Sequence, residues 1–128
     1  SVKLREQLGL LSGPVEEFQK SAEAEHNAML SMLVDEGYLD ASALEDELAN
    51  ENEIIDALYR GLKGSPCKLM AASIVDAVGE KRTQNQPGTS NEYPNWRIPL
   101  ADGDGNVVPL EQLFDNTRLQ EIAAIMRG

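Results

Sequence analysis

Cysteine and histidine are almost missing from this chain of 128 residues, since each occurs once, as Cys67 and His26. A lone cysteine cannot close a disulfide within the chain, which favours a reducing compartment such as the cytoplasm. One cysteine and one histidine also cannot assemble a Cys/His zinc site. His26 is a candidate general base, but a partly buried histidine with one hydrogen bond is the favoured interpretation. We therefore expect no metal and no cofactor.

Long apolar runs and positive charge are also scarce. The longest run, 69–72 followed by Ile74-Val75, is far shorter than the ~20 residues that a membrane-spanning helix needs. The chain has 11 basic and 22 acidic residues, and its net charge is −11. A field of this sign repels phosphate backbones and anionic lipid surfaces, so neither nucleic acid nor a membrane is an expected partner. A neutral ligand such as a sugar is unaffected by it.

The first half of the chain is dominated by helical periodicity. After Gly13-Pro14, apolar positions recur every three or four residues and trace one helix face that ends near Gly37. These positions are Val15, Phe18, Ala22, His26, Met29 and Leu33. A capping box at 42–45 and a helix start at 50–53 follow, and Gly64-Ser65-Pro66 stops the second pattern. A last amphipathic pattern covers 119–126, so we expect an acidic helical array with a helix at its end.

The pattern changes at Lys68, where a nearly continuous apolar run begins. Bounded by Pro66 and Asp76, the run predicts a strand near 68–75 that is buried on both faces, as in a parallel sheet. Its alanines and methionine leave a buried helix start as the competing interpretation. Because the chain offers no second convincing strand, the neighbouring strands would come from elsewhere in a larger α/β fold. Asp76 would lie either at the carboxyl end of a barrel strand, where active sites form, or at a helix N-cap.

Residues 79–106 are rich in turn formers, and a loop of this length is often functional. The segment 102–106 (Asp-Gly-Asp-Gly-Asn) resembles the start of an EF-hand calcium loop, but Val107 and Leu113 stand where glycine and glutamate are required. A surface turn is the favoured interpretation, and a calcium-dependent structural domain is a minor alternative. Trp96, the only tryptophan, could stack on a sugar ring or anchor the loop to the core.

Two neighbouring motifs carry a resemblance to a known family. Gln84-Asn85-Gln86-Pro87-Gly88-Thr89 contains an Asn-x-Pro-Gly-Thr turn, and 91–97 reads Asn-Glu-Tyr-Pro-Asn-Trp-Arg. Both resemble segments near the C-terminus of the amylomaltase (4-alpha-glucanotransferase, disproportionating enzyme) family. The opening residues 4–11 resemble the family's segment after its last catalytic aspartate, and Ser65-Pro66 with the apolar run resembles its eighth barrel strand. The resemblance is strongest over 65–120.

The resemblance implies a fold and a reaction. Residues 1–128 would be the C-terminal segment of a glucanotransferase catalytic domain with a (β/α)8 TIM-type barrel. In that picture 1–64 is the helical part, and 65–128 holds the last barrel strand, the substrate loop and the final helices. The implied reaction transfers α-1,4-glucan segments between maltodextrins by a retaining mechanism, in which one carboxylate attacks and another acts as acid and base. The family's catalytic carboxylates lie in earlier segments, so we expect none here and an inactive isolated chain.

The resemblance also implies a set of substrate-binding residues. Asn85 resembles the family's sugar-contacting asparagine, whose amide can both donate to and accept from sugar hydroxyls. Pro87 and Gly88 would shape its turn, and Gln84 and Asp76 are further candidates. The expected partners are a maltodextrin or glycogen-derived glucan and the remainder of the same polypeptide, with self-association of the isolated chain through an unpaired strand edge. The alternative is a free-standing acidic helical interaction module without catalysis.

Overall fold

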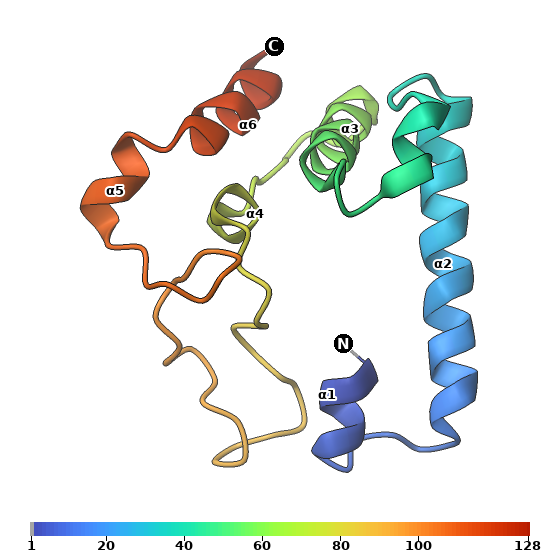
Figure 1. Cartoon of the computed structure of the whole chain (residues 1–128), viewed down its shortest axis with the longest axis vertical. Coiled ribbons are helices and arrows are strands. Elements are labelled where there is room, and N and C mark those ends of the chain that lie inside the picture. Colours follow the sequence, from blue (N-terminus) through green and yellow to red (C-terminus); the bar gives the residue numbers. More distant parts are fainter. Residues whose placement is uncertain (1) are drawn as a thin grey trace.

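The computed structural model describes residues 2–128 as short and long helices joined to one long irregular segment (Figure 1). The elements are α1 (Val2–Gln7), α2 (Val15–Asp35), the 3-10 helix η1 (Ala41–Asp46), α3 (Glu51–Gly64), α4 (Ile74–Val78), α5 (Leu110–Phe114) and α6 (Thr117–Arg127). Among the residues described, no sheet forms, and one isolated antiparallel bridge joins Ala101 to Val107.

The longest helix, α2, follows the predicted periodicity but uses only part of the predicted face. Gly37 ends it in a left-handed conformation with φ 74°, which glycine adopts without steric cost. The backbone N–H of Tyr38 then donates to the carbonyl of Leu33 at 2.8 Å. Leu30 and Leu33 are buried, whereas residues 21–28 are exposed on every side. The middle of α2 therefore runs past open space rather than against a neighbouring helix.

The helix starts agree only partly with the sequence prediction. The second long helix begins at Glu51, as the pattern at 50–53 predicts. The predicted capping box at 42–45 does not form as such, because Asp40 is the N-cap of η1. The Asp40 side chain accepts the backbone N–H of Ser42 at 2.8 Å. An aspartate two residues earlier caps the first turn at the N–H of Ser42, so this element starts earlier than the pattern predicts.

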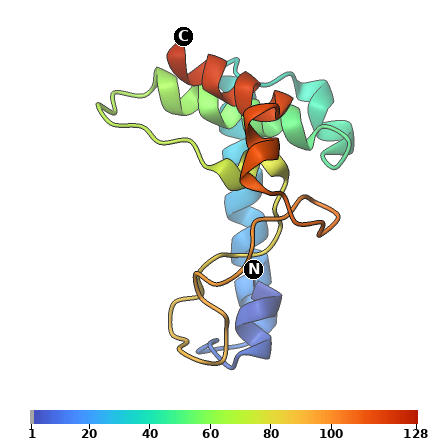
Figure 2. The same ribbon diagram turned by 90° about the vertical axis from the view of Figure 1, so that its left-hand side faces the viewer.

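Two hydrophobic clusters lie on α3 and its neighbours. One joins α2, η1 and α3, and its buried residues are Leu30, Leu33, Leu39, Ala43, Ile54 and Ala57. The other joins α3, α4 and α6 through buried Tyr59, Ala77 and Ile122. Figures 1 and 2 show α3 and α6 side by side, and Arg118 of α6 contacts Asp56 of α3 at 2.9 Å. The final helix, predicted from 119–126, is thus confirmed and packs on α3.

The buried strand predicted near 68–75 is wrong for the part of the chain that the structure describes. Residues 69–73 have no regular structure and no partner strand among the described residues, and Leu69 is 93% exposed. Regular structure resumes as the helix α4 at Ile74. A strand needs a neighbour to hydrogen-bond its backbone, and residues 2–128 supply none for this run. The competing interpretation, a helix start, holds only for Ile74–Val78.

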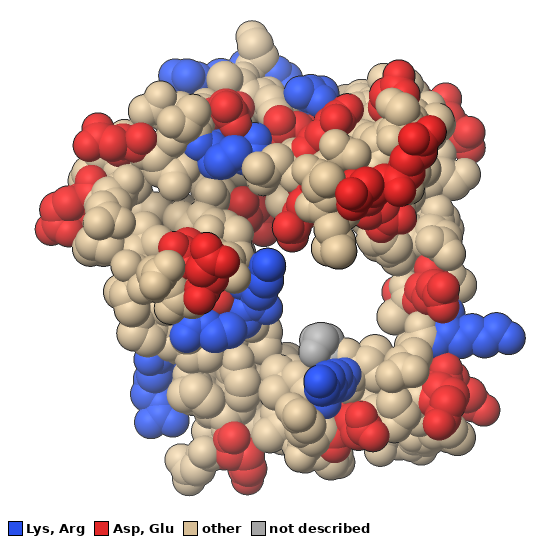
Figure 3. Space-filling view, in the orientation of Figure 1, with Lys and Arg blue, Asp and Glu red and all other residues tan. Residues whose placement is uncertain are grey.

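The chain encloses an opening rather than a continuous core. The space-filling view shows a hole through its middle, with α2 along one side and the long irregular segment along the other (Figure 3). At the lower end of α2, α1 closes the ring, and the Arg5 guanidinium lies 5.6 Å from the centre of the Phe18 ring. The exposed middle turns of α2 face the space around this opening.

Gly64 provides a sharp test of the packing around α3. A Cβ at Gly64 would overlap Tyr38 Oη, whereas one at Gly61 would lie 3.4 Å from Leu33 Cδ2, an ordinary contact. We expect Gly64→Ala to lower the free energy of unfolding by about 1–3 kcal/mol. Gly61→Ala should be neutral or stabilising, because alanine favours helix interiors by up to about 1 kcal/mol. Urea unfolding measures both.

A substitution at Tyr38 tests the same contact from the other side. Tyr38→Phe removes the oxygen that a Cβ at Gly64 would overlap. The double variant Gly64→Ala/Tyr38→Phe should therefore recover part of the lost stability. Equal stability of the Gly61 and Gly64 variants would contradict this packing.

Candidate functional site

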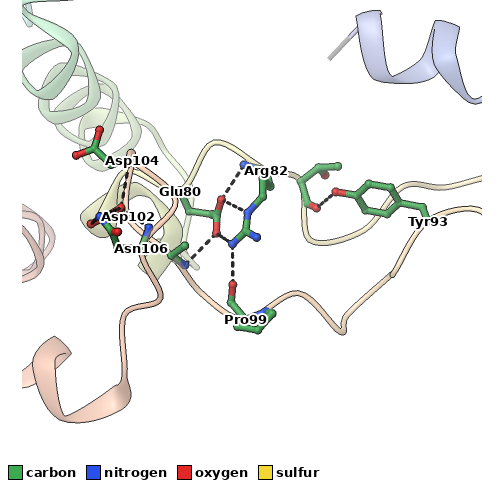
Figure 4. A network of polar contacts seen from close by, with 9 residues as sticks. Glu80, Arg82, Tyr93, Pro99, Asp102, Asp104 and Asn106 are labelled. Atoms are coloured by element: carbon green, nitrogen blue, oxygen red, sulfur yellow. Dashed lines mark hydrogen bonds and ion pairs between the residues drawn. The ribbon is translucent and has the colours of Figure 1, made fainter.

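The irregular segment between α4 and α5 begins at a buried carboxylate, Glu80, shown in Figure 4. The side chain of Glu80 is only 1% exposed. It accepts from Arg82 Nε at 2.9 Å, from Arg82 Nη2 at 2.6 Å and from the backbone N–H groups of Arg82 and Ala101 at 2.9 and 3.0 Å. Arg82 Nη2 also donates to the carbonyl of Pro99 at 2.8 Å. These contacts fasten the start of the segment 80–101 to its end.

The electrostatics of Glu80 follow from those donors. Hydrogen bonds from the Arg82 side chain stabilise the ionised carboxylate first of all, and they outweigh the cost of burial. Together with the backbone donors of Arg82 and Ala101 they lower the pKa of Glu80 to about 2. Glu80 is therefore a structural anion at neutral pH and carries no proton that a reaction could use.

The far end of the segment is organised by Asn95. Its Oδ1 accepts the backbone N–H of Gln86 at 2.7 Å, and its Nδ2 donates to Thr89 Oγ1 at 2.9 Å. Thr89 Oγ1 in turn donates to the carbonyl of Gln86 at 2.6 Å. The Asn-x-Pro-Gly-Thr turn is thus held from inside by the asparagine of the second motif. We call residues 83–96 the polar loop.

A shallow cleft opens beside the polar loop. It has a volume of about 440 Å³ and is lined by Leu4 of α1 and by loop residues that include Arg82, Thr83 and Tyr93. The Tyr93 hydroxyl donates to the carbonyl of Thr83 at 2.5 Å, so the two arms of the loop are joined along the cleft wall. An aromatic ring beside hydrogen-bonding groups is a surface that a sugar can occupy.

Four of the predicted site residues lie in the polar loop. Asn85 is half-buried, and among the described residues no hydrogen bond engages its side-chain amide, while its carbonyl accepts from Thr83 Oγ1 at 2.9 Å. Gln84 accepts the Trp96 N–H at its carbonyl, and its buried Nε2 has no hydrogen-bond partner in residues 2–128. Pro87 and Gly88 form the turn. Gly88 has φ 87°, and a Cβ there would lie 3.3 Å from Leu10 Cδ2.

The fifth predicted residue, Asp76, belongs to a different contact. It lies in the first turn of α4, so it is neither at the end of a strand nor the N-cap, which is Ser73. The buried Tyr59 donates its hydroxyl to Asp76 Oδ2 at 2.6 Å and accepts the backbone N–H of Ser73 at 2.9 Å. Burial, and then this bond to Asp76, raises the pKa of Tyr59. Asp76 therefore ties α4 to α3, a role that the sequence pattern did not reveal.

Of the remaining predictions, the turn at 102–106 is confirmed, whereas His26 and Trp96 are more exposed than expected. His26 is not buried: its side chain is 47% exposed and pairs with Glu47 Oε2 at 2.7 Å. Trp96 is 76% exposed with φ 58°, so it does not anchor the loop to a core within the described residues. The segment 102–106 forms a turn in which Asp102 accepts from Asn106, and this lowers the pKa of Asp102. Residues 2–128 contain no group of three or more potential metal-ligating side chains.

Comparison with known proteins identifies a class of enzymes. The family model described as 4-alpha-glucanotransferase matches residues 12–104. The 4-alpha-glucanotransferase of Mycobacterium tuberculosis is 45% identical over 127 residues, which are 99% of this chain and 17% of that protein. The one from Haemophilus influenzae is 29% identical over 122 residues, with coverages of 93% and 17%. The crystal structure of amylomaltase from Corynebacterium glutamicum superposes with a TM-score of 0.77 at 32% identity, covering 98% of this chain and 18% of that one.

All of these matches carry glucanotransferase or amylomaltase names. The chain belongs to the 4-alpha-glucanotransferase family. It spans about 17% of the length of the curated relatives that it matches. No comparison supports the alternative of an interaction module. None of the helices described is long and apolar enough to cross a membrane.

The contact between Tyr59 and Asp76 predicts a stability effect. Tyr59→Phe removes the donor to a half-buried carboxylate and the acceptor of the Ser73 N–H. We expect a loss of about 1–3 kcal/mol in the free energy of unfolding. Asp76→Asn should cost less, because its amide oxygen can still accept from Tyr59. Urea unfolding compares the two, and an unchanged stability of Tyr59→Phe would contradict the contact.

The lowered pKa of Glu80 predicts a pH dependence with a defined sign. Because the folded pKa of about 2 lies below the ordinary value of 4.5, ionised Glu80 stabilises the folded state above pH 4.5. That stabilisation is lost as the pH falls from 4.5 towards 2. The difference in free energy of unfolding between wild type and Glu80→Gln should be constant from about pH 5 to about pH 8 and shrink below pH 4.5. A difference that persists unchanged in acid, measured by unfolding at each pH, would refute this assignment.

Proposed function

We propose that this chain supplies part of the glucan-binding cleft of a 4-alpha-glucanotransferase, an enzyme that transfers α-1,4-glucan segments between maltodextrins. The observation that carries the proposal is the polar loop. Its Asn-x-Pro-Gly-Thr turn is hydrogen-bonded internally through Asn95, while the amide of Asn85 is left without a partner among the residues described. A half-buried amide with free donors and acceptors suits vicinal sugar hydroxyls.

The proposal divides the loop residues by role. Asn85 would contact the sugar, and Gln84, whose buried Nε2 also lacks a partner within the described part of the chain, would be the second candidate. Pro87 and Gly88 would shape the turn, Pro87 by fixing φ and Gly88 by accepting φ 87°. Asp76 remains a further candidate for contact with the glucan, because its carboxylate accepts one hydrogen bond from Tyr59 and has acceptor sites to spare.

The reaction itself needs groups beyond these. A retaining transfer uses one carboxylate as nucleophile and another as acid and base, about 5–5.5 Å apart. Glu80 cannot act as the acid, since it is buried, fully hydrogen-bonded and ionised. We propose that the catalytic carboxylates belong to the remainder of the same polypeptide and that this chain alone is inactive.

The same proposal covers the place of the chain in the whole protein. Residues 1–64 would form a helical part and 65–128 the end of a (β/α)8 barrel, with the exposed run at 69–73 covered by the remainder of the polypeptide. The exposed Leu69 and Met70 support this, because their apolar surface has no cover among residues 2–128. A cytoplasmic location, suggested by the lone Cys67, belongs to this proposal as well.

Asn85→Ala tests the sugar contact in the protein that carries this chain. We expect kcat/KM for maltotriose disproportionation to fall by about fivefold to a hundredfold, because one or two hydrogen bonds to the substrate are lost. The thermal midpoint should change little, since the side chain bonds nothing else described here.

Asn91→Ala is the matched control for that substitution. It removes the same amide from an exposed position in the same loop and should leave the kinetics unchanged. Wild-type kinetics for Asn85→Ala, or equal losses in both variants, would refute the assignment of Asn85.

A further inference from the structure

The polar loop and the residues on either side of it bury almost no apolar side chain. Of residues 81–100, only Gln86 is buried, and it is polar. A chain segment without a hydrophobic core keeps one conformation only if its hydrogen bonds specify it. The geometry of the loop must therefore come from its polar contacts, and their arrangement shows which contact the others depend on.

Those contacts form a continuous path from Glu80 to Asn85. Glu80 holds Arg82 by its side chain and by its backbone N–H. The next residue, Thr83, accepts from the Tyr93 hydroxyl and donates through Oγ1 to the carbonyl of Asn85. The path starts at the buried carboxylate of Glu80, just before the polar loop, and ends at Asn85, the residue proposed to contact the glucan.

Glu80 also fixes the opposite arm. Its Oε2 accepts the backbone N–H of Ala101, and Arg82 donates to the carbonyl of Pro99. The contacts of one carboxylate and one guanidinium thus hold together the segment that enters the loop and the segment that leaves it. Figure 4 shows these contacts. A planar guanidinium bound through two nitrogens has a fixed direction, which a single lysine ammonium would not provide.

We infer that Glu80 and Arg82 are positioning residues for glucan binding, which hold the polar loop so that Asn85 faces the substrate. The inference rests on the proposed function, because it assigns the pair a role in the same site. Neither residue needs to touch the glucan or the reacting atoms. Their effect on the reaction would pass through the loop and through Asn85.

The test uses the whole protein that carries this chain. Glu80→Gln keeps the size of the side chain and an oxygen that can accept from Ala101, but it loses the charge that binds Arg82. We expect KM for maltotriose to rise by about fivefold, the effect of one net hydrogen bond, with a smaller change in kcat. Glu92→Gln is the matched control, because Glu92 is an exposed carboxylate of the same loop, and its side chain accepts from the backbone N–H of its near neighbour Ser90.

A double-substitution cycle separates positioning from a general loss of stability. If Glu80 acts through Asn85, Glu80→Gln should have little further effect on KM in an Asn85→Ala background. A merely structural role would lower the two variants' activities independently, giving additive losses. Additive losses, or an unchanged KM in Glu80→Gln, would overturn the inference.

Amide hydrogen exchange gives a readout that does not need activity. Glu80→Gln should speed exchange at the backbone amides of Gln86 and Trp96, which are hydrogen-bonded inside the loop, while Glu92→Gln should not. Unchanged exchange would overturn the positioning role even if the protein transfers glucans. If Glu80→Gln speeds exchange but the wild-type protein shows no transferase activity, the proposed function is refuted and Glu80 remains the residue that orders the loop.

Discussion

The long segment between α4 and α5 has to be held by hydrogen bonds, because it buries no apolar side chain between residues 81 and 100. Closing a loop of about 20 residues costs about 3 kcal/mol of chain entropy. At the base of the loop, the Glu80 carboxylate offsets this cost by binding Arg82 and the N–H of Ala101. At the tip, Asn95 does so through its hydrogen bonds to Gln86 and Thr89. The contacts of Glu80 and Asn95 therefore position the residues between them, including Asn85.

The rest of the structure has the form expected of a part that packs around something else. Two modest clusters on α3 hold the helices together, while the middle of α2 is exposed on all sides and the chain surrounds an opening (Figure 3). Leu69 and Phe114 are also exposed. These exposed surfaces are consistent with a chain that matches about 17% of the length of its relatives.

Local signals in the sequence predicted the helices well, because caps, glycines and apolar spacing act within one turn. The helix after Pro14, the start at 50–53 and the last helix all form. The strand at 68–75 failed because pairing is not local: the run is apolar enough, but residues 2–128 supply no neighbour. The motifs at 84–89 and 91–97 located the loop, yet nothing in their spacing showed that Asn95 holds the turn. Glu80 was missed altogether, since one acidic residue among 22 gives no signal until folding brings Arg82 and Ala101 to it.

The central claim is that a preformed polar loop presents the amide of Asn85 to a glucan. The most direct measurement is a titration of the whole protein with maltoheptaose, followed through the side-chain amide resonances of its asparagines. The account predicts that the Asn85 resonance shifts with saturable dependence on the sugar, while that of Asn95, which is bonded inside the loop, shifts little. A saturable shift that leaves Asn85 unaffected would place the glucan elsewhere and contradict the account.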